Sequence, residues 1–119
     1  MIYCPDKWVV VKITRDGVPD LYKVFGSWYG GYLDGDSWRM NSGIERVSFD
    51  GERYNFHGFS GSTYSCSIAD GSYGIHMYGG GVIAGFQKQA AEVDHGFEIM
   101  PEDTDWFSLD YTTEVLANE

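Results

Sequence analysis

Basic residues are scarce in this chain: its 119 residues include 8 Lys and Arg against 18 Asp and Glu, and its formal net charge is −10. Nucleic acids and anionic membranes, which are polyanions, repel such a chain. Long apolar runs are also missing, since the longest is Trp8 to Val11, far too short to span a bilayer. We therefore expect neither direct nucleic-acid binding nor membrane binding. The charge suits a protein partner with a basic surface, and acidity that serves only solubility is the alternative.

Cysteine and histidine are too few and too scattered to indicate a metal site. Cys4, Cys66 and the three histidines lack the paired spacing that structural zinc sites show. The first residues show no basic region followed by a long apolar stretch, so we expect no signal peptide. We expect a cytoplasmic protein with two reduced thiols and no metal or other cofactor.

Motifs for catalysis and phosphate binding are missing as well. The stretch HGFSGS, which begins at His57, lacks the spacing of a nucleophile elbow. The stretch GGGVIAG from Gly79 lacks the Lys-Ser or Lys-Thr of a P-loop. We therefore expect a protein that is not an enzyme. A third alternative is a small hydrolase built on His57, which requires His57 to lie in a pocket beside a nucleophile.

Aromatic residues and glycines are abundant, and together they favour β structure. Aromatics make up 17% of the chain, which also contains 16 glycines. The β-branched run KWVVVKIT predicts a strand over residues 7–14, and LYKVFGSW predicts its hairpin partner over residues 21–28. STYSCSI predicts a further strand over residues 62–68. The length indicates one domain, residues 1–119, whose last residues, 112–119, we expect to fray.

The clearest local signal is a hairpin over residues 44–57, IERVSFDGERYNFH. Asp50-Gly51 is typical of a two-residue type I′ turn. That turn would pair Phe49 with Glu52 and Val47 with Tyr54. One face would then carry Val47, Phe49, Tyr54 and Phe56. The other face would carry Ile44, Arg46, Ser48, Arg53, Asn55 and His57.

A helix is predicted over residues 82–93, where apolar residues recur at helical spacing and Gln87 to Glu92 are good helix formers. Short strands are predicted at 73–78, at 97–100 and around 106–110. The expected fold class is α+β: a mainly antiparallel, twisted β-sheet or partly open barrel that packs with one α-helix near residues 82–93.

Two stretches are candidate binding sites. In PEDTDWFSLDY, residues 101–111, acids alternate with aromatics, and no Lys or Arg follows Lys88. Acids that steer association and aromatics that anchor it suit a basic partner surface. The candidate partner contacts are Asp103, Asp105, Trp106 and Asp110, followed by Asp34 and Asp36. A solvated acidic tail whose aromatics close the core is the alternative for this stretch.

The second stretch is GSWYGGYLDGDSWRMNSG, residues 26–43, in which glycines mark tight turns. We expect Trp28 and Trp38 to pack inward at strand ends. The alternative is a ligand-binding β domain, for example for carbohydrate, in which exposed aromatics stack on the ligand. Its candidate residues are Trp28, Tyr29, Tyr32 and Trp38.

The stretches WVVVKI, WYGGYLDGDSWRMNSGI, FHGFSGSTY and MPEDTDW carry a resemblance in general character. Through them the chain resembles the small uncharacterised proteins encoded by tailed bacteriophages and prophages. The resemblance implies an accessory protein of the host cytoplasm that binds and inhibits a host protein, for example a nucleic-acid-handling defence factor. It brings no catalytic motif with it. The protein would act as a monomer, or as a homodimer joined at an exposed sheet edge.

Overall fold

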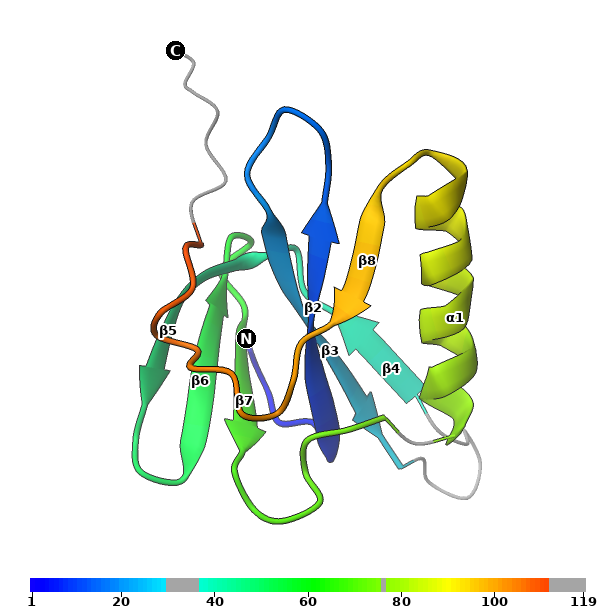
Figure 1. Ribbon diagram of the computed structural model, residues 1–119. Coiled ribbons are helices and arrows are strands. Elements are labelled where there is room, and N and C mark those ends of the chain that lie inside the picture. The colour runs from blue at the N-terminus through cyan, green and yellow to red at the C-terminus, as the bar shows by residue number, and fades with distance from the viewer. Residues whose placement is uncertain (30–36, 76, 112–119) are drawn as a thin grey trace.

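Eight strands and one helix make up the part of the chain that the computed structural model describes, residues 1–29, 37–75 and 77–111. They are β1 (Ile2–Tyr3), β2 (Lys7–Thr14), β3 (Leu21–Trp28), β4 (Ser37–Met40), β5 (Ile44–Phe49), β6 (Arg53–Gly58), β7 (Thr63–Ser67), α1 (Met77–Glu92) and β8 (Gly96–Ile99). The strands form two four-stranded sheets, in the orders β1-β7-β6-β5 and β4-β3-β2-β8 (Figure 1). All strand pairs are antiparallel except β1 with β7. The expected class, mainly antiparallel β structure with one helix, is confirmed. Within these residues the strands form two packed sheets and no closed barrel.

The sheet β4-β3-β2-β8 is the middle layer, with α1 on one face and the sheet β1-β7-β6-β5 on the other (Figure 1). Side chains of β2 alternate between the two interfaces. Trp8 and Val10 belong to the core between the sheets, whereas Val9 and Val11 belong to the core under the helix. Because both faces are covered, β2 is a continuous apolar run. The predicted strands 7–14 and 21–28 are confirmed as β2 and β3.

The β5–β6 hairpin forms where it was predicted, but the predicted register is wrong by two residues. Phe49 pairs with Tyr54, and Val47 pairs with Phe56. The reason is the Asp50 carboxylate, which accepts hydrogen bonds from the backbone N–H groups of Glu52 and Arg53, at 2.9 and 2.8 Å. A longer loop results, in which Gly51 has a positive φ (101°) and Asp50 does not, so the turn is not type I′.

The faces of the hairpin survive this shift, because two residues are one full period of a strand. Ile44 is the exception. The register shifts between Ile44 and Arg46, so Ile44 turns inward and is fully buried in the core between the sheets. A bulge of this kind changes the face that a side chain occupies. The prediction that Ile44 lies on the polar face is therefore wrong.

Helix α1 begins five residues before the predicted start and ends one residue before the predicted end. Three consecutive glycines disfavour a helix by propensity, and the tertiary context overrides that preference here. Ile83 anchors the helix against Val9, Val11 and Phe25. The strand predicted at 73–78 is wrong, because Tyr73 makes only an isolated bridge with Trp8 and the helix begins at Met77.

The helix ends in a Schellman motif. The His95 N–H bonds to the Ala90 carbonyl at 2.8 Å, and the Asp94 N–H bonds to the Ala91 carbonyl at 3.2 Å. Asp94 holds the left-handed position of the motif, with φ 59°. Gly96, which follows this motif, begins β8. The expectation for residues 112–119 lies outside the described residues.

Candidate functional site

A segment without strands or helix, residues 100–111, crosses from the end of β8 to the other sheet and lies over the gap between the two sheets (Figure 1). At its start, the Met100 N–H donates to the Val10 carbonyl at 2.8 Å. The Tyr73 hydroxyl donates to the Met100 carbonyl at 2.5 Å. We call residues 100–111 the closing segment. The short strand predicted around 106–110 is wrong, since this part of the segment consists of turns and bends.

Trp106 anchors the closing segment. Its side chain is 2% exposed and belongs to the core between the sheets. The centre of its ring lies 5.8 Å from that of Trp8, 5.9 Å from that of Phe56 and 5.9 Å from that of Tyr73. Aromatic pairs at these separations add about 0.5–1.5 kcal/mol each to the stabilisation from burial. One side chain therefore ties both sheets to the closing segment.

Local hydrogen bonds shape the segment on either side of Trp106. Pro101 and Asp105 are typical turn residues. The Thr104 N–H and hydroxyl both donate to the Pro101 carbonyl, at 3.2 and 2.6 Å. The Asp105 carboxylate accepts from the Phe107 N–H at 3.1 Å. Beyond Trp106, the Tyr111 hydroxyl donates to the Trp106 carbonyl at 2.5 Å. These bonds hold the acidic residues of the segment in a defined conformation.

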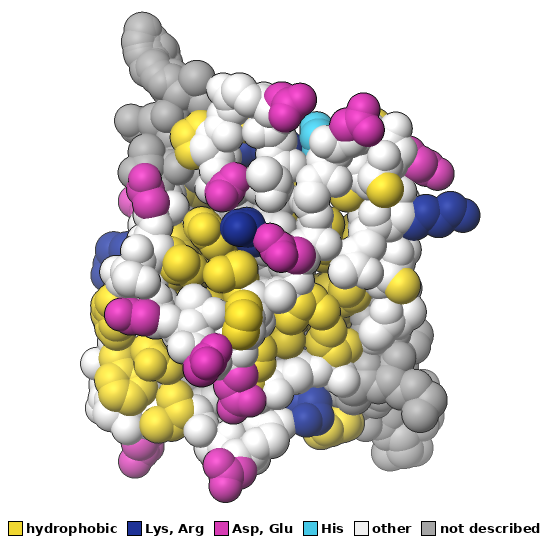
Figure 2. All heavy atoms as spheres, in the orientation of Figure 1, with side chains coloured by type: hydrophobic (Ala, Val, Ile, Leu, Met, Phe, Trp, Pro, Cys, Tyr) yellow, Lys and Arg dark blue, Asp and Glu magenta, His cyan; other side chains and the backbone are white. Residues whose placement is uncertain are grey.

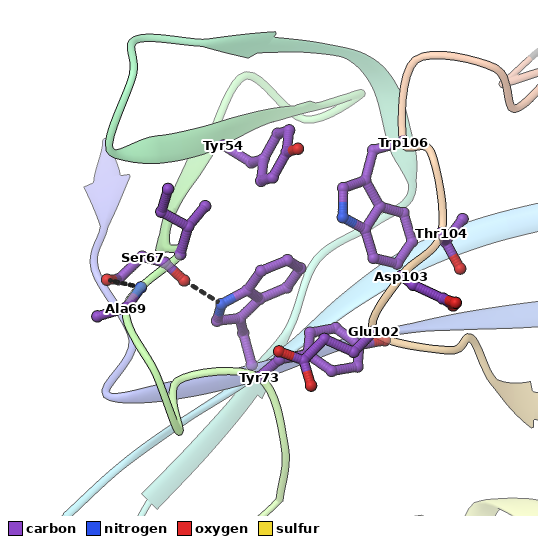
Figure 3. A pocket seen from close by; sticks show the side chains of 10 residues that line it. Tyr54, Ser67, Ala69, Tyr73, Glu102, Asp103, Thr104 and Trp106 are labelled. Carbon is purple, nitrogen blue, oxygen red and sulfur yellow. Dashed lines mark hydrogen bonds between the residues drawn. The ribbon is translucent and has the colours of Figure 1, made fainter.

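Beside Trp106 lies a pocket of about 230 Å³, formed by residues from four separate parts of the chain (Figure 3). Its walls are Trp8, Tyr54, Ser67, Ile68, Ala69, Tyr73, Glu102, Asp103, Thr104 and Trp106. The aromatic walls come from β2, β6, the loop after β7 and the closing segment. Two acidic residues, Glu102 and Asp103, also line the pocket, and in Figure 3 the Asp103 side chain points away from the aromatic rings. The pocket thus combines aromatic walls with polar groups, and ligand sites in proteins commonly combine the two.

The two indole N–H groups at the pocket differ in their partners. The Trp8 N–H donates to the Ser67 carbonyl at 2.9 Å. The Trp106 N–H has no acceptor among the described residues. Its nitrogen still reaches solvent, unlike the buried polar atoms that lack a partner. In Figure 3 the Trp106 nitrogen faces the inside of the pocket, on the side of Tyr54. A donor of this kind is open to a ligand that carries an acceptor.

Glu102 contributes negative charge to the pocket. In Figure 3 its carboxylate lies in front of Tyr73. Burial raises the pKa of Tyr73 to about 12, and the charge of Glu102 acts in the same direction. The Tyr73 hydroxyl is already engaged, since it also accepts from the Val10 N–H at 3.2 Å. The free acceptor in this part of the pocket is therefore the Glu102 carboxylate.

The structure places the predicted partner contacts unequally. Asp103, Asp105 and Asp110 are exposed on the closing segment, whereas Trp106 is buried and lines the pocket. Asp34 and Asp36 lie outside the described residues. Glu102, Asp103 and Asp105 make no ion pair within the described residues, where the salt bridge is Lys12 with Glu98 at 3.2 Å. Figure 2 shows acidic side chains spread over this face, with few basic ones and with hydrophobic groups between them.

Sequence reasoning missed Trp8, Tyr54, Tyr73 and Glu102 as site residues. Trp8 and Tyr54 were assigned only to strands, and Tyr73 to a strand that does not form. Glu102 could have been included from the sequence, because it is the first acid of the PEDTDW stretch that supplied Asp103 and Asp105 as candidates. Nothing in the sequence indicated that residues 8, 54 and 73 would meet residue 106, because their separations along the chain exceed the reach of any local pattern.

The aromatic residues of the alternative ligand site do not form one platform. Trp28 is half-buried and donates its indole N–H to the Cys4 carbonyl at 3.0 Å. Its ring contacts Tyr3, on the face toward the other sheet. Trp38 is 37% exposed and stacks on Phe25, on the face toward α1. Trp28 and Trp38 therefore point to opposite faces of one sheet. Tyr29 is exposed, and Tyr32 lies outside the described residues.

His57 lies in a row of polar side chains on the outer face of the sheet β1-β7-β6-β5. Its Nε2 is 3.2 Å from the Ser48 hydroxyl, and its Nδ1 is 3.2 Å from the Thr63 hydroxyl. Burial lowers the pKa of His57, and the neighbouring Arg46 lowers it further. A serine–histidine pair in a hydrolase has an acid on the other imidazole nitrogen. In this protein the other imidazole nitrogen, Nδ1, faces the Thr63 hydroxyl and not an acid.

Both cysteines are free, with Cys4 exposed and Cys66 buried. Burial raises the pKa of the Cys66 thiol well above its ordinary value, so this thiol is not a reactive nucleophile. Among residues 1–29, 37–75 and 77–111, no three His, Cys, Asp or Glu side chains gather in a way that could hold a metal ion. The helix in these ranges is too short to cross a membrane. Searches with this chain find no matching family model, no similar curated protein and no similar solved structure.

Proposed function

We propose that this protein is a non-enzymatic binding protein that recognises a basic surface of another protein through the closing segment. Glu102, Asp103 and Asp105 stand on a short, hydrogen-bonded piece of chain, and Trp106 holds that piece in the core. Because the segment is ordered before it binds, association costs little further conformational entropy. Carboxylates in this arrangement attract a cationic partner and orient it.

The observation that carries the proposal is the gathering of three acids, without counter-ions in the described part of the chain, directly beside a buried aromatic anchor. Glu102, Asp103 and Asp105 have no cationic partner within the described residues. Acids that serve only solubility need no buried aromatic anchor beside them. In the closing segment, three acids within four residues directly precede a tryptophan that is 2% exposed. This is a rigid anionic surface with an adjoining pocket.

The resemblance to small tailed-phage proteins supports a host protein as the partner, and inhibition as the consequence of binding. A rigid acidic surface competes with nucleic acid for a basic groove, because both present negative charge to the same cations. A nucleic-acid-handling defence factor is therefore the proposed class of target. The chain would occupy the groove without cleaving or modifying anything.

The test is affinity capture from nuclease-treated bacterial lysate, with quantification of a single partner that the unmodified protein captures. The variant is the double charge reversal Asp103→Lys with Asp105→Lys. We expect it to weaken capture by about tenfold or more at low salt, since an exposed ion pair contributes about 0.2–1 kcal/mol and reversal replaces attraction by repulsion. Circular dichroism checks that the variant folds.

The matched control is Asp16→Lys with Glu92→Lys. Both acids are exposed and lie away from the closing segment, and the change in net charge is the same. The proposal requires the control to bind like the unmodified protein. Equal loss of binding in both variants would mean that only net charge matters. Unchanged binding of the Asp103 and Asp105 variant at low salt would exclude the closing segment as the interface.

A further inference from the structure

We propose that the pocket beside Trp106 accepts an arginine side chain of the partner protein. This inference rests on the proposed function and gives the acidic surface a specific ligand. Three features of the pocket carry it. They are an aromatic wall large enough for a planar cation, a carboxylate at that wall, and an indole N–H that lacks an acceptor.

The size of the pocket suits one long side chain. A closed protein cavity of about 150 Å³ holds a molecule as large as benzene. The pocket here has a volume of about 230 Å³ and is walled by the rings of Trp8, Tyr54, Tyr73 and Trp106. The apolar stem of an arginine would lie along these rings, as long cationic side chains do on apolar surfaces.

The charge of the pocket selects a cation. Glu102 and Asp103 both line it, and no Lys or Arg does. The Glu102 carboxylate, in front of Tyr73, has no ion pair within the described residues. A guanidinium that binds this carboxylate in a bidentate manner would at the same time lie against aromatic rings. An ammonium group offers neither the planar fork nor the stacking surface, so we expect arginine to bind more tightly than lysine.

The Trp106 N–H explains why the ligand is a residue of a peptide and not a free cation. The side chain is 2% exposed, and its unpartnered donor faces the pocket. A guanidinium cannot accept a hydrogen bond, but the backbone carbonyl of the same arginine residue can. The pocket thus offers one acceptor for the cationic end of the ligand and one donor for its backbone.

The test uses the intact protein and N-acetyl-arginine amide as the probe, and follows the indole N–H signals in ¹H–¹⁵N correlation spectra. The chain has four tryptophans, and Trp106→Phe identifies the signal that belongs to Trp106. We expect saturable binding with an affinity of about millimolar, because the probe is small, and a shift of the Trp106 signal. N-acetyl-lysine amide should bind several-fold more weakly, and the neutral citrulline analogue should show no saturation.

Glu102→Gln is the decisive variant, since Glu102 is exposed and its substitution leaves the core intact. We expect it to weaken binding of the arginine probe at least about fivefold. Glu92→Gln, a change of the same type on α1, should have no effect. Equal binding of the citrulline analogue, an unchanged affinity in Glu102→Gln, or saturation by a sugar but not by arginine would each overturn the inference.

Failure of this inference is distinguishable from failure of the proposed function. If the arginine probe does not bind but reversal of Asp103 and Asp105 still abolishes capture of the partner, the acidic surface is the interface and the pocket is not used. If the reversal has no effect on capture, the proposed function itself is wrong, whatever the probe does.

Discussion

Two tryptophans of the same core make a matched pair for a stability experiment. Trp8 and Trp106 are 3% and 2% exposed, and their ring centres lie 5.8 Å apart. Their indole N–H groups differ, because the Trp8 N–H donates to the Ser67 carbonyl and the Trp106 N–H has no acceptor among the described residues. Replacement of each by phenylalanine separates the packing of the ring from the hydrogen bond.

The magnitudes follow from these contacts. Both changes lose ring area, and a loss of about 40–80 Å² at 25 cal/mol per Å² lowers the free energy of unfolding by about 1–2 kcal/mol. Trp8→Phe also removes a hydrogen bond, which contributes about 0.5–1.5 kcal/mol. We therefore expect Trp8→Phe to be more destabilising than Trp106→Phe by about 1 kcal/mol, which is about 3–6 °C in Tm for a domain of this size.

The assay is urea unfolding followed by circular dichroism, because the two variants differ from the unmodified protein in tryptophan fluorescence. A Trp106→Phe variant that loses as much stability as Trp8→Phe, or more, would show that the Trp106 N–H has a partner in the folded protein. That result would refute both the reading of the pocket as an open site and the arginine inference drawn from it.

Two further predictions concern the close packing around Gly43 and the burial of two tyrosine hydroxyls. At Gly43, φ is 145° and an added Cβ would lie 2.9 Å from side-chain atoms of Leu21 and Phe59, so Gly43→Ala should lower the free energy of unfolding by about 2–4 kcal/mol in urea titrations. At Gly51, where the space is open, the change to Ala should lower it by about 1 kcal/mol. Equal effects of the two substitutions would contradict the close packing around Gly43. Burial raises the pKa of Tyr64 and Tyr73 to about 12, so the folded state keeps protons that the unfolded chain loses above its ordinary tyrosine pKa of about 10. The free energy of unfolding should therefore fall between about pH 10 and pH 12, as urea titrations and tyrosinate absorbance would show, and no fall in that window would contradict the burial of these hydroxyls.

The sequence predicted the elements whose signals are local. The predicted bounds of β2 and β3 agree with the structure at both ends of each strand. Each of these strands is one unbroken segment with an apolar or alternating pattern. The register of β5 and β6 could not be predicted in the same way. It depends on two hydrogen bonds of the Asp50 side chain and on a shift beside Ile44, and a period-2 pattern contains neither.

The candidate site was predicted in part. The acidic stretch from Glu102 to Asp110 was visible in the sequence, and the exposure of Asp103 and Asp105 agrees with a surface role. The pocket was not visible, because Trp8, Tyr54 and Tyr73 meet Trp106 only after both sheets have formed. The relative placement of Trp28 and Trp38 was not visible either, since β3 and β4 direct these two side chains to opposite faces.

The long separation between Trp8 and Trp106 along the chain has a consequence for biosynthesis. Trp8 and Trp106 are 98 residues apart (106 − 8), yet they share one core. At about 5–20 residues per second, a ribosome needs about 5–20 s to add Trp106 after Trp8 has been made. During that interval the inner faces of both sheets lack their covering segment. The nascent chain must therefore pass through a stage with exposed aromatic surface, when it is most open to chaperones and to aggregation.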